Sequence, residues 1–355
     1  MKFTYRTRLL IDDIYLFIDK TNCFENMSTI KKSFSFEMFL WIWIGLFIQQ
    51  QYFTFATFSF NQPRFRTNTT WNSNAITFTN RSFVGSYPSG IFVNSNNSIY
   101  ISNRETGQIH IWQNKNDLNP TKTISGNLSY PQSIFVTTNG DIYVDNGNNR
   151  RVDKWIVENE TWISVMNITS RCFALFVDIY ENLYCSLWEN HRVDKKWSNG
   201  TTTIVAGTGV QGSESDMLTN PWGIFVDINL DLYVADCNNH RIQLFRLNQR
   251  NGITVAGKGS ASVTIKLSVP SGIVLDGDRH LFIVDHGNNR IIGSDENGFR
   301  CIFACTDDKG STNDKLSSPI TISFDSYGNI YVTDYNNHRV QKILKSQVCG
   351  KLFFF

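Results

Sequence analysis

The stretch NPWGIFVDINLDLYVADCNNHRIQLF, residues 220–245, contains the pattern that decides the fold. Within it, runs rich in apolar, β-branched and aromatic residues cover 223–227, 231–236 and 241–245, and turn-forming residues stand between them. Such runs are typical of short β-strands joined by tight turns. A fourth run at 253–256 precedes a Gly-rich stretch. The unit therefore predicts four antiparallel strands of about five residues each.

The same pattern occurs six times between residues 87 and 343. Because a four-stranded sheet of this size cannot bury its own faces, the copies must pack against one another, and a radial arrangement protects their edges. The sequence predicts an all-β fold, a six-bladed β-propeller of four-stranded antiparallel blades. Aligned without gaps, one column holds Gln108, Arg151, Arg192, Arg241, Arg290 and Arg339, at spacings of 43, 41, 49, 49 and 49 residues.

The ring also needs a strand to close its last blade. The sixth copy has no clear fourth strand before Val348, whereas AITFT at 75–79 has strand character without a blade of its own. We expect the run at 75–79 to close the ring, and the tail VCGKLFFF is the competing candidate. The expected organisation is an N-terminal extension (1–56), a linker with the closing strand (57–86), the propeller (87–345) and a short tail (346–355).

The repeat resembles that of the NHL-repeat family. NNHRI at 238–242 and NNHRV at 336–340 correspond to the region that gives the family its name. Pro-x-Gly-Ile, Leu-Tyr-Val-x-Asp and Asn-Asn-x-Arg-Val/Ile together make the resemblance specific, and it covers about residues 87–343. It implies a six-bladed β-propeller.

Aspartate and arginine flank one turn in each of the last three copies. A binding or catalytic site does not need the same residues in every blade, whereas blade packing does. We therefore interpret these residues as structural, each turn being held by a partly buried carboxylate and a bidentate arginine. The pairs are Asp236 with Arg241, Asp285 with Arg290, and Asp334 with Arg339; the first three copies are degenerate and have Asn103, Asn146 and Leu187 in the Asp column.

The loops that link the second and third strands of the blades are expected on one face of the disc. Aromatic, Arg and His side chains there are the types that anchor interfaces. We predict a scaffold without a catalytic constellation that binds a protein, peptide or glycan; exposure of ordinary turn residues is the alternative. The predicted binding residues are Arg104, Arg150, Trp188, His191, His240, His286, Asn289, Tyr335 and His338.

Three of these histidines, His191, His240 and His338, share one column, and three convergent histidines can bind zinc. The same column also contains Gly107, Arg150 and Asn289, and the three blades concerned lie apart around the ring. No cofactor is predicted, and zinc or calcium in the central channel stays open.

Two other functions remain as alternatives. The first is a secreted metal-dependent enzyme similar to the peptidyl-hydroxyglycine amidating lyase or to propeller lactonases and hydrolases. Resemblance to the lyase implies metal histidines at the starts of the first strands, where this chain has none. The second is an NHL domain like those of tripartite-motif proteins, which bind RNA or protein. The positions at the starts of the first strands, where resemblance to the lyase implies histidines, are Ser89, Gln132, Phe173, Trp222, Ser271 and Ile320.

The most apolar segment, MFLWIWIGLFI at 38–48, suggests export. It is shorter than the about 20 residues of a membrane span and has the length of a signal-peptide core. A cleaved signal and a single-pass anchor both place the propeller outside the cell, whereas a cytosolic protein with a non-targeting N-terminus is the third possibility.

The sequons and cysteines agree with a secreted glycoprotein. We expect the propeller to be monomeric. Six of seven cysteines follow the apolar run, an even number that suits disulfides. The net charge of +2 and the absence of a basic stripe disfavour nucleic acid as a partner. The predicted glycosylation sites are Asn68, Asn80, Asn96, Asn127, Asn159, Asn167 and Asn199.

Overall fold

The computed structural model describes residues 58–114, 117–261, 264–306 and 308–346. The chain divides at residue 57, and all described residues belong to the unit 58–355. The apolar segment at 38–48 and the tail from residue 347 lie outside the described residues. In the described part of the chain, no helix has the length and apolar character needed to cross a membrane.

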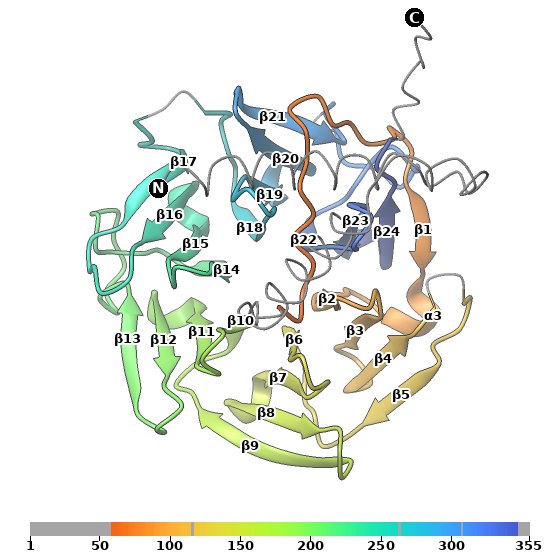
Figure 1. Ribbon diagram of the computed structural model, residues 1–355, viewed down its shortest axis with the longest axis vertical. Helices are drawn as coiled ribbons and strands as arrows, with labels where there is room; N and C mark the ends of the chain where they lie inside the picture. Colours follow the sequence, from red (N-terminus) through yellow and green to blue (C-terminus); the bar gives the residue numbers. More distant parts are fainter. Residues whose placement is uncertain (1–57, 115–116, 262–263, 307, 347–355) are drawn as a thin grey trace, which may run out of the picture. The chain divides into compact units, whose positions relative to one another are not determined.

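The second unit is a six-bladed β-propeller (Figure 1). Every blade is a four-stranded antiparallel sheet, and in blades 1–5 the strands follow one another from the centre outwards. Their bounds are β2 (Ile91–Val93), β3 (Ile99–Asn103), β4 (Gln108–Trp112) and β5 (Lys122–Ser125) in blade 1; β6 (Ile134–Val136), β7 (Ile142–Asn146), β8 (Arg151–Ile156) and β9 (Thr161–Asn167) in blade 2; β10 (Cys172–Val177), β11 (Leu183–Leu187), β12 (Arg192–Lys196) and β13 (Thr202–Ala206) in blade 3; β14 (Pro221–Val226), β15 (Leu232–Asp236), β16 (Arg241–Phe245) and β17 (Ile253–Gly257) in blade 4; and β18 (Pro270–Leu275), β19 (Leu281–Asp285), β20 (Arg290–Asp295) and β21 (Gly298–Phe303) in blade 5.

The last blade joins the two ends of the propeller. It contains β22 (Pro319–Phe324), β23 (Ile330–Asp334), β24 (Arg339–Ile343) and, from the other end, β1 (Ile76–Thr79). β1 pairs antiparallel with β24, which confirms that the run at 75–79 closes the ring. The short helix α3 (Arg81–Val84) then leads into blade 1.

The core fills the spaces between blades. Because each second strand is covered on both sides, its residues are buried throughout, as in β11 and β15. This explains why runs such as LYVAD are almost continuously apolar instead of alternating.

The turn between the first and second strands is also built alike in several blades. Asp178 Oδ1 accepts hydrogen bonds from the backbone N–H groups of Tyr180 (2.9 Å) and Asn182 (3.0 Å). Such side-chain bonds to the backbone two and four residues on stabilise a tight turn. Asp227, Asp276 and Asp325 repeat the arrangement.

The Asp–Arg pairs of the last three blades hold the connection that leads into the same blade. Asp236 Oδ1 accepts the Thr219 N–H at 2.7 Å, and its Oδ2 accepts Arg241 Nε–H at 2.7 Å. Instead of forming a bidentate fork, Arg241 donates its other N–H groups to backbone carbonyls of residues 213–217. The pairs Asp285–Arg290 and Asp334–Arg339 have Nε–Oδ2 distances of 2.9 and 2.7 Å.

Blades 2 and 3 replace the missing aspartate with another carboxylate. Arg151 pairs with Asp153 and Arg192 with Asp194, each at 2.8 Å and each two residues further along the third strand. Blades 2 and 3 thus keep an ion pair at the arginine column, whereas blade 1 has Gln108 there, whose side chain donates to Ser125 Oγ at 3.3 Å.

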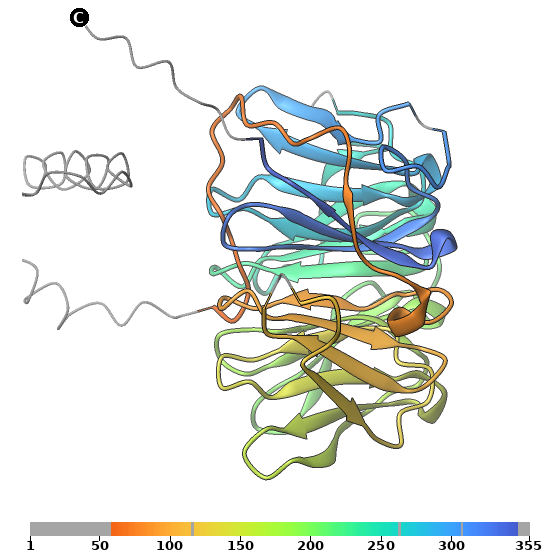
Figure 2. The same cartoon turned by 90° about the vertical axis from the view of Figure 1, so that its right-hand side faces the viewer.

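Residues 58–71 run across one face of the disc, as Figure 2 shows. Asn61 donates to the carbonyls of Asn94 (2.7 Å) and Phe324 (3.1 Å), which lie where first strands end. Trp71 Nε1–H donates to Gly328 O at 2.9 Å. We call residues 58–71 the strap, because they tie several blades together.

The described part of the chain contains two disulfides, Cys172–Cys185 and Cys301–Cys305. Cys237 is buried and unpaired among the described residues. The even count of six cysteines therefore does not correspond to three disulfides within the part of the chain that the structure covers.

Candidate functional site

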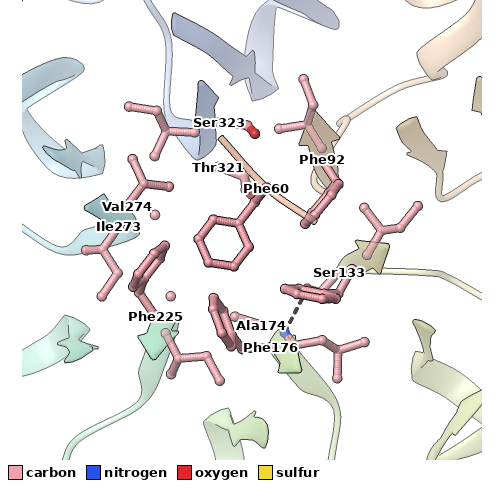
Figure 3. Close-up of a pocket in the computed structure, with 18 of the residues that line it drawn as sticks. Phe60, Phe92, Ser133, Ala174, Phe176, Phe225, Ile273, Val274, Thr321 and Ser323 are labelled. Atoms are coloured by element: carbon pink, nitrogen blue, oxygen red, sulfur yellow. Dashed lines mark hydrogen bonds between the residues drawn. The ribbon is translucent and has the colours of Figure 1, made fainter. Parts of the chain in front are cut away.

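The central channel is narrow and apolar. Its cavity of about 90 Å³ is smaller than the roughly 300 Å³ of a typical small-molecule site. Phe60 of the strap lies inside a ring of phenylalanines from the first strands (Figure 3). Its centroid lies 6.3, 5.4 and 5.3 Å from those of Phe135, Phe176 and Phe225. Phe60 of the strap therefore plugs the channel at the end where the first strands end.

An aromatic cluster occupies the other end of the channel, where first strands begin. Phe173 and Trp188 are stacked with centroids 4.9 Å apart, and Trp222 stands perpendicular to both at 5.3 Å. His286 adds a fourth ring, 5.5 Å from Trp222. These four residues, only partly buried, are called the aromatic cluster below.

A second group of side chains lies on the same face, on blades 1, 2, 3 and 6. The guanidinium carbons of Arg104 and Arg171 lie 4.4 and 5.6 Å from the ring centroid of Tyr130. Arg104 also donates to the hydroxyl of Tyr335 at 3.2 Å, and Tyr335 packs against Tyr87. These five residues are called the arginine–tyrosine cluster.

The histidine column has a structural role. His191, His240 and His338 occupy the left-handed position that ends the turn before the third strand, with φ of 52°, 57° and 53°. Nδ1 of each ring accepts the N–H of the residue before the proline that begins the next blade. The donors are Asn220 to His191 (3.1 Å), Val269 to His240 (3.0 Å) and Tyr87 to His338 (3.2 Å).

Of three other predicted residues, Asn289 and His286 bond the backbone, whereas Arg150 is exposed. Asn289 takes the place of a histidine, because its Oδ1 accepts the Ser318 N–H at 2.8 Å. Arg150 shares the left-handed conformation (φ 49°) and is exposed. His286 Nδ1–H donates to Pro319 O at 2.9 Å, and burial lowers the pKa of its ring, which favours the neutral form.

No group of three metal-ligating side chains is found among the described residues. The three histidines of one column lie in different blades and bond the backbone through Nδ1. The seven asparagines of the sequons are all exposed.

Asp145 in β7 is the most unusual charged residue near this end of the channel. It is fully buried, its Oδ1 accepts the Cys172 N–H at 3.3 Å, and its Oδ2 has no hydrogen-bond partner among the described residues. Desolvation raises the pKa of this carboxyl well above its usual range, although the charges of Arg171 and Arg104 oppose the shift. The other blades have no acid at the equivalent position, so Asp145 is not part of the repeat.

Substitution of Asp145 by asparagine should stabilise the protein at neutral pH. Because the pKa is higher in the folded than in the unfolded state, the folded chain binds more protons between the two values, and stability falls as pH rises through that interval. We expect Asp145→Asn to raise the free energy of unfolding by about 1 kcal/mol at about pH 7.5 and to change it little at about pH 4. Urea unfolding at both pH values tests this, and lower stability of the variant at about pH 7.5 would contradict it.

Sequence reasoning did not identify Tyr87, Tyr130 and Arg171 as site residues. They belong to the connections between blades, and these connections reach the same face as the strand 2–3 turns. The signal was available in the repeat, because all three lie just before the start of a first strand. Phe173 and Trp222 do stand at first-strand starts, where the sequence indicates only that histidine is absent.

The comparisons agree with this architecture. The family model of the NHL repeat matches residues 218–245 and 316–343. No curated protein matches the chain. A protein of unknown function from Bacteroides thetaiotaomicron is similar in structure, with 15% identity and a TM-score of 0.63 over 77% of this chain and 76% of that one.

Two further structures are similar to this chain. One is an auxiliary nutrient binding protein from Bacteroides thetaiotaomicron (15% identity, TM-score 0.52, 82% of this chain and 76% of that one). The other is a catalytically inactive virginiamycin B lyase from Staphylococcus aureus with quinupristin (12% identity, TM-score 0.53, 80% and 90%). At such identities the likeness shows the fold alone.

Proposed function

Because this chain is an NHL-repeat six-bladed β-propeller, we propose that it is a binding module that recognises a peptide segment of a partner protein. The ligand lies across the face that holds the aromatic and arginine–tyrosine clusters. One observation carries this proposal: Trp, Phe, Tyr and Arg side chains from several blades converge around one end of the channel while Phe60 plugs the other. Partly exposed Trp, Tyr and Arg are the residues that dominate binding energy at interfaces.

The geometry of the aromatic cluster favours a peptide over a glycan. A sugar ring stacks on an open, flat aromatic face. Here Phe173 covers one face of Trp188, and Trp222 meets both rings at angles of 85° and 82°. Angled walls of this kind suit an apolar side chain, which is held from two sides.

Several features support a location outside the cytosol as part of the proposal. Two disulfides form within the propeller, and disulfides persist mainly in oxidising compartments. All seven sequon asparagines are exposed, so each is accessible to glycosylation.

Substitution of Trp222 by alanine is expected to weaken binding at least about tenfold, since it removes the ring that contacts Phe173, Trp188 and His286. The test uses arrays of peptides and glycans probed with the purified propeller, followed by titration of the strongest ligand. Trp162→Ala is the matched control, because Trp162 lies on β9, the outermost strand of blade 2.

The control should bind like the wild type. Equal loss in both variants, or unchanged binding in Trp222→Ala, would contradict the location of the site. A preference for glycans would overturn the choice of a peptide ligand.

A further inference from the structure

One position of the ring around the channel lacks a side chain. The first residue of the turn after the second strand is Arg104, Trp188, Cys237, His286 or Tyr335 in five of the blades, and Gly147 in blade 2. A Cβ at Gly147 would lie 2.8 Å from Tyr130 O, 3.3 Å from Asp145 Oδ2 and 3.8 Å from Arg171 Cδ. Glycine is therefore needed here for close approach, and three polar or charged residues converge on it.

Arg104 and Arg171 approach Tyr130 from the neighbouring blades. Neither arginine forms an ion pair with a carboxylate among the residues that the structure describes. Within the described ranges, Arg171 donates only to an amide oxygen, that of Asn148 at 3.2 Å, and Arg104 Nε is buried without an acceptor. Two guanidiniums at the ring of one tyrosine thus retain unused donors for an anion.

The unpartnered oxygen of Asp145 is the second observation that points to a ligand. Its Oδ2 lies beside Gly147, next to Arg171 and the Tyr130 backbone. A buried carboxyl with a free oxygen costs stability, and the other blades avoid it by carrying Ser, Ala, Val or Thr at this position. When protonated, it does not oppose an anion bound by the two arginines.

We propose that the arginine–tyrosine cluster binds the free C-terminal carboxylate of the peptide ligand. This inference rests on the function proposed above and specifies its ligand. Arg171 is two residues before Phe173, so a carboxylate beside Tyr130 places the last side chain of the peptide at the aromatic cluster. A guanidinium matches the planar, two-oxygen geometry of a carboxylate, and a desolvated site strengthens the attraction.

The test compares peptides that differ only at their C-terminus. The probes are two sets of acetylated hexapeptides that end in Phe, Trp, Leu or Lys, one as free acids and one as C-terminal amides. Binding to the full propeller is measured by calorimetry at low and high salt. We expect the free acids that end in an apolar residue to bind at least about tenfold more tightly than their amides.

Arg104→Gln and Arg171→Gln should each remove most of this difference in affinity between the free acids and the amides. Arg64→Gln is the control, because Arg64 is exposed and lies in the strap at the opposite end of the channel. It should retain the full preference. Circular dichroism before each titration verifies that the variants are folded.

The outcomes separate the two proposals. If acids and amides bind equally and Trp222→Ala abolishes both, the binding face stands and the carboxylate site is wrong. If neither set binds, both the peptide function and the carboxylate site are overturned. If inorganic phosphate or sulfate competes with the free acids more strongly than acetate does, the cluster is a site for those anions and the carboxylate proposal fails.

Discussion

Replacement of Asp236 by alanine is expected to lower the free energy of unfolding by about 3–5 kcal/mol. The Asp236 carboxylate is fully buried and accepts hydrogen bonds from the Thr219 N–H, from Asn239 at 2.8 Å and from Arg241 at 2.7 Å. Without it, the guanidinium of Arg241, itself almost fully buried, loses its counter-charge. Urea unfolding followed by circular dichroism measures the loss.

Two further variants show whether the effect comes from the buried charge. Asp236→Asn keeps one of the two oxygen acceptors and the size of the side chain, and should lose less stability than the alanine variant. Glu160→Ala removes an exposed partner of Lys122 and should change stability by no more than about 1 kcal/mol. Equal effects of Asp236→Ala and Glu160→Ala would refute the structural role of the Asp–Arg pairs.

Phe60→Ala should destabilise the propeller by about 3 kcal/mol. The Phe60 ring contacts Phe135, Phe176 and Phe225, which come from three different blades, so its loss leaves a hole between them. Thermal unfolding provides the measurement. Peptide binding should persist in the folded variant, because the plug and the proposed binding face lie at opposite ends of the channel.

Leu118→Ala is a suitable control, since Leu118 is 88% exposed and should contribute little. A loss for Phe60→Ala as small as that of the control would mean that the strap does not hold the blades together in solution. Loss of binding without loss of stability would instead indicate that the plugged end takes part in ligand recognition.

The repeat made the fold predictable, because each blade carries its own strand pattern and its own turn residues. The column that ends in Arg339 fixed the number of blades, and the orphan strand at 75–79 fixed how the ring closes. Both features depend on local residue patterns, and these patterns are visible in a single sequence.

The contacts between blades were not predictable in the same way. His240 was expected on a binding face, but its bond to the Val269 N–H depends on the angle between neighbouring blades. The role of Phe60 depends on contacts with blades that are distant in sequence, and the segment around it reads only as a linker. Tyr130 and Arg171 stand at one place in the repeat, but their meeting with Arg104 on one face depends on contacts between blades.

Ligands are proposed to bind at the end of the channel opposite the strap. Hydrogen–deuterium exchange of the propeller, with and without its strongest peptide ligand, tests this location most directly. Binding at this end should slow exchange in residues 171–173, 186–191 and 220–223 and should leave exchange in the strap and in the turns that follow first strands unchanged. Protection confined to the strap, to those turns or to the outermost strands would contradict it.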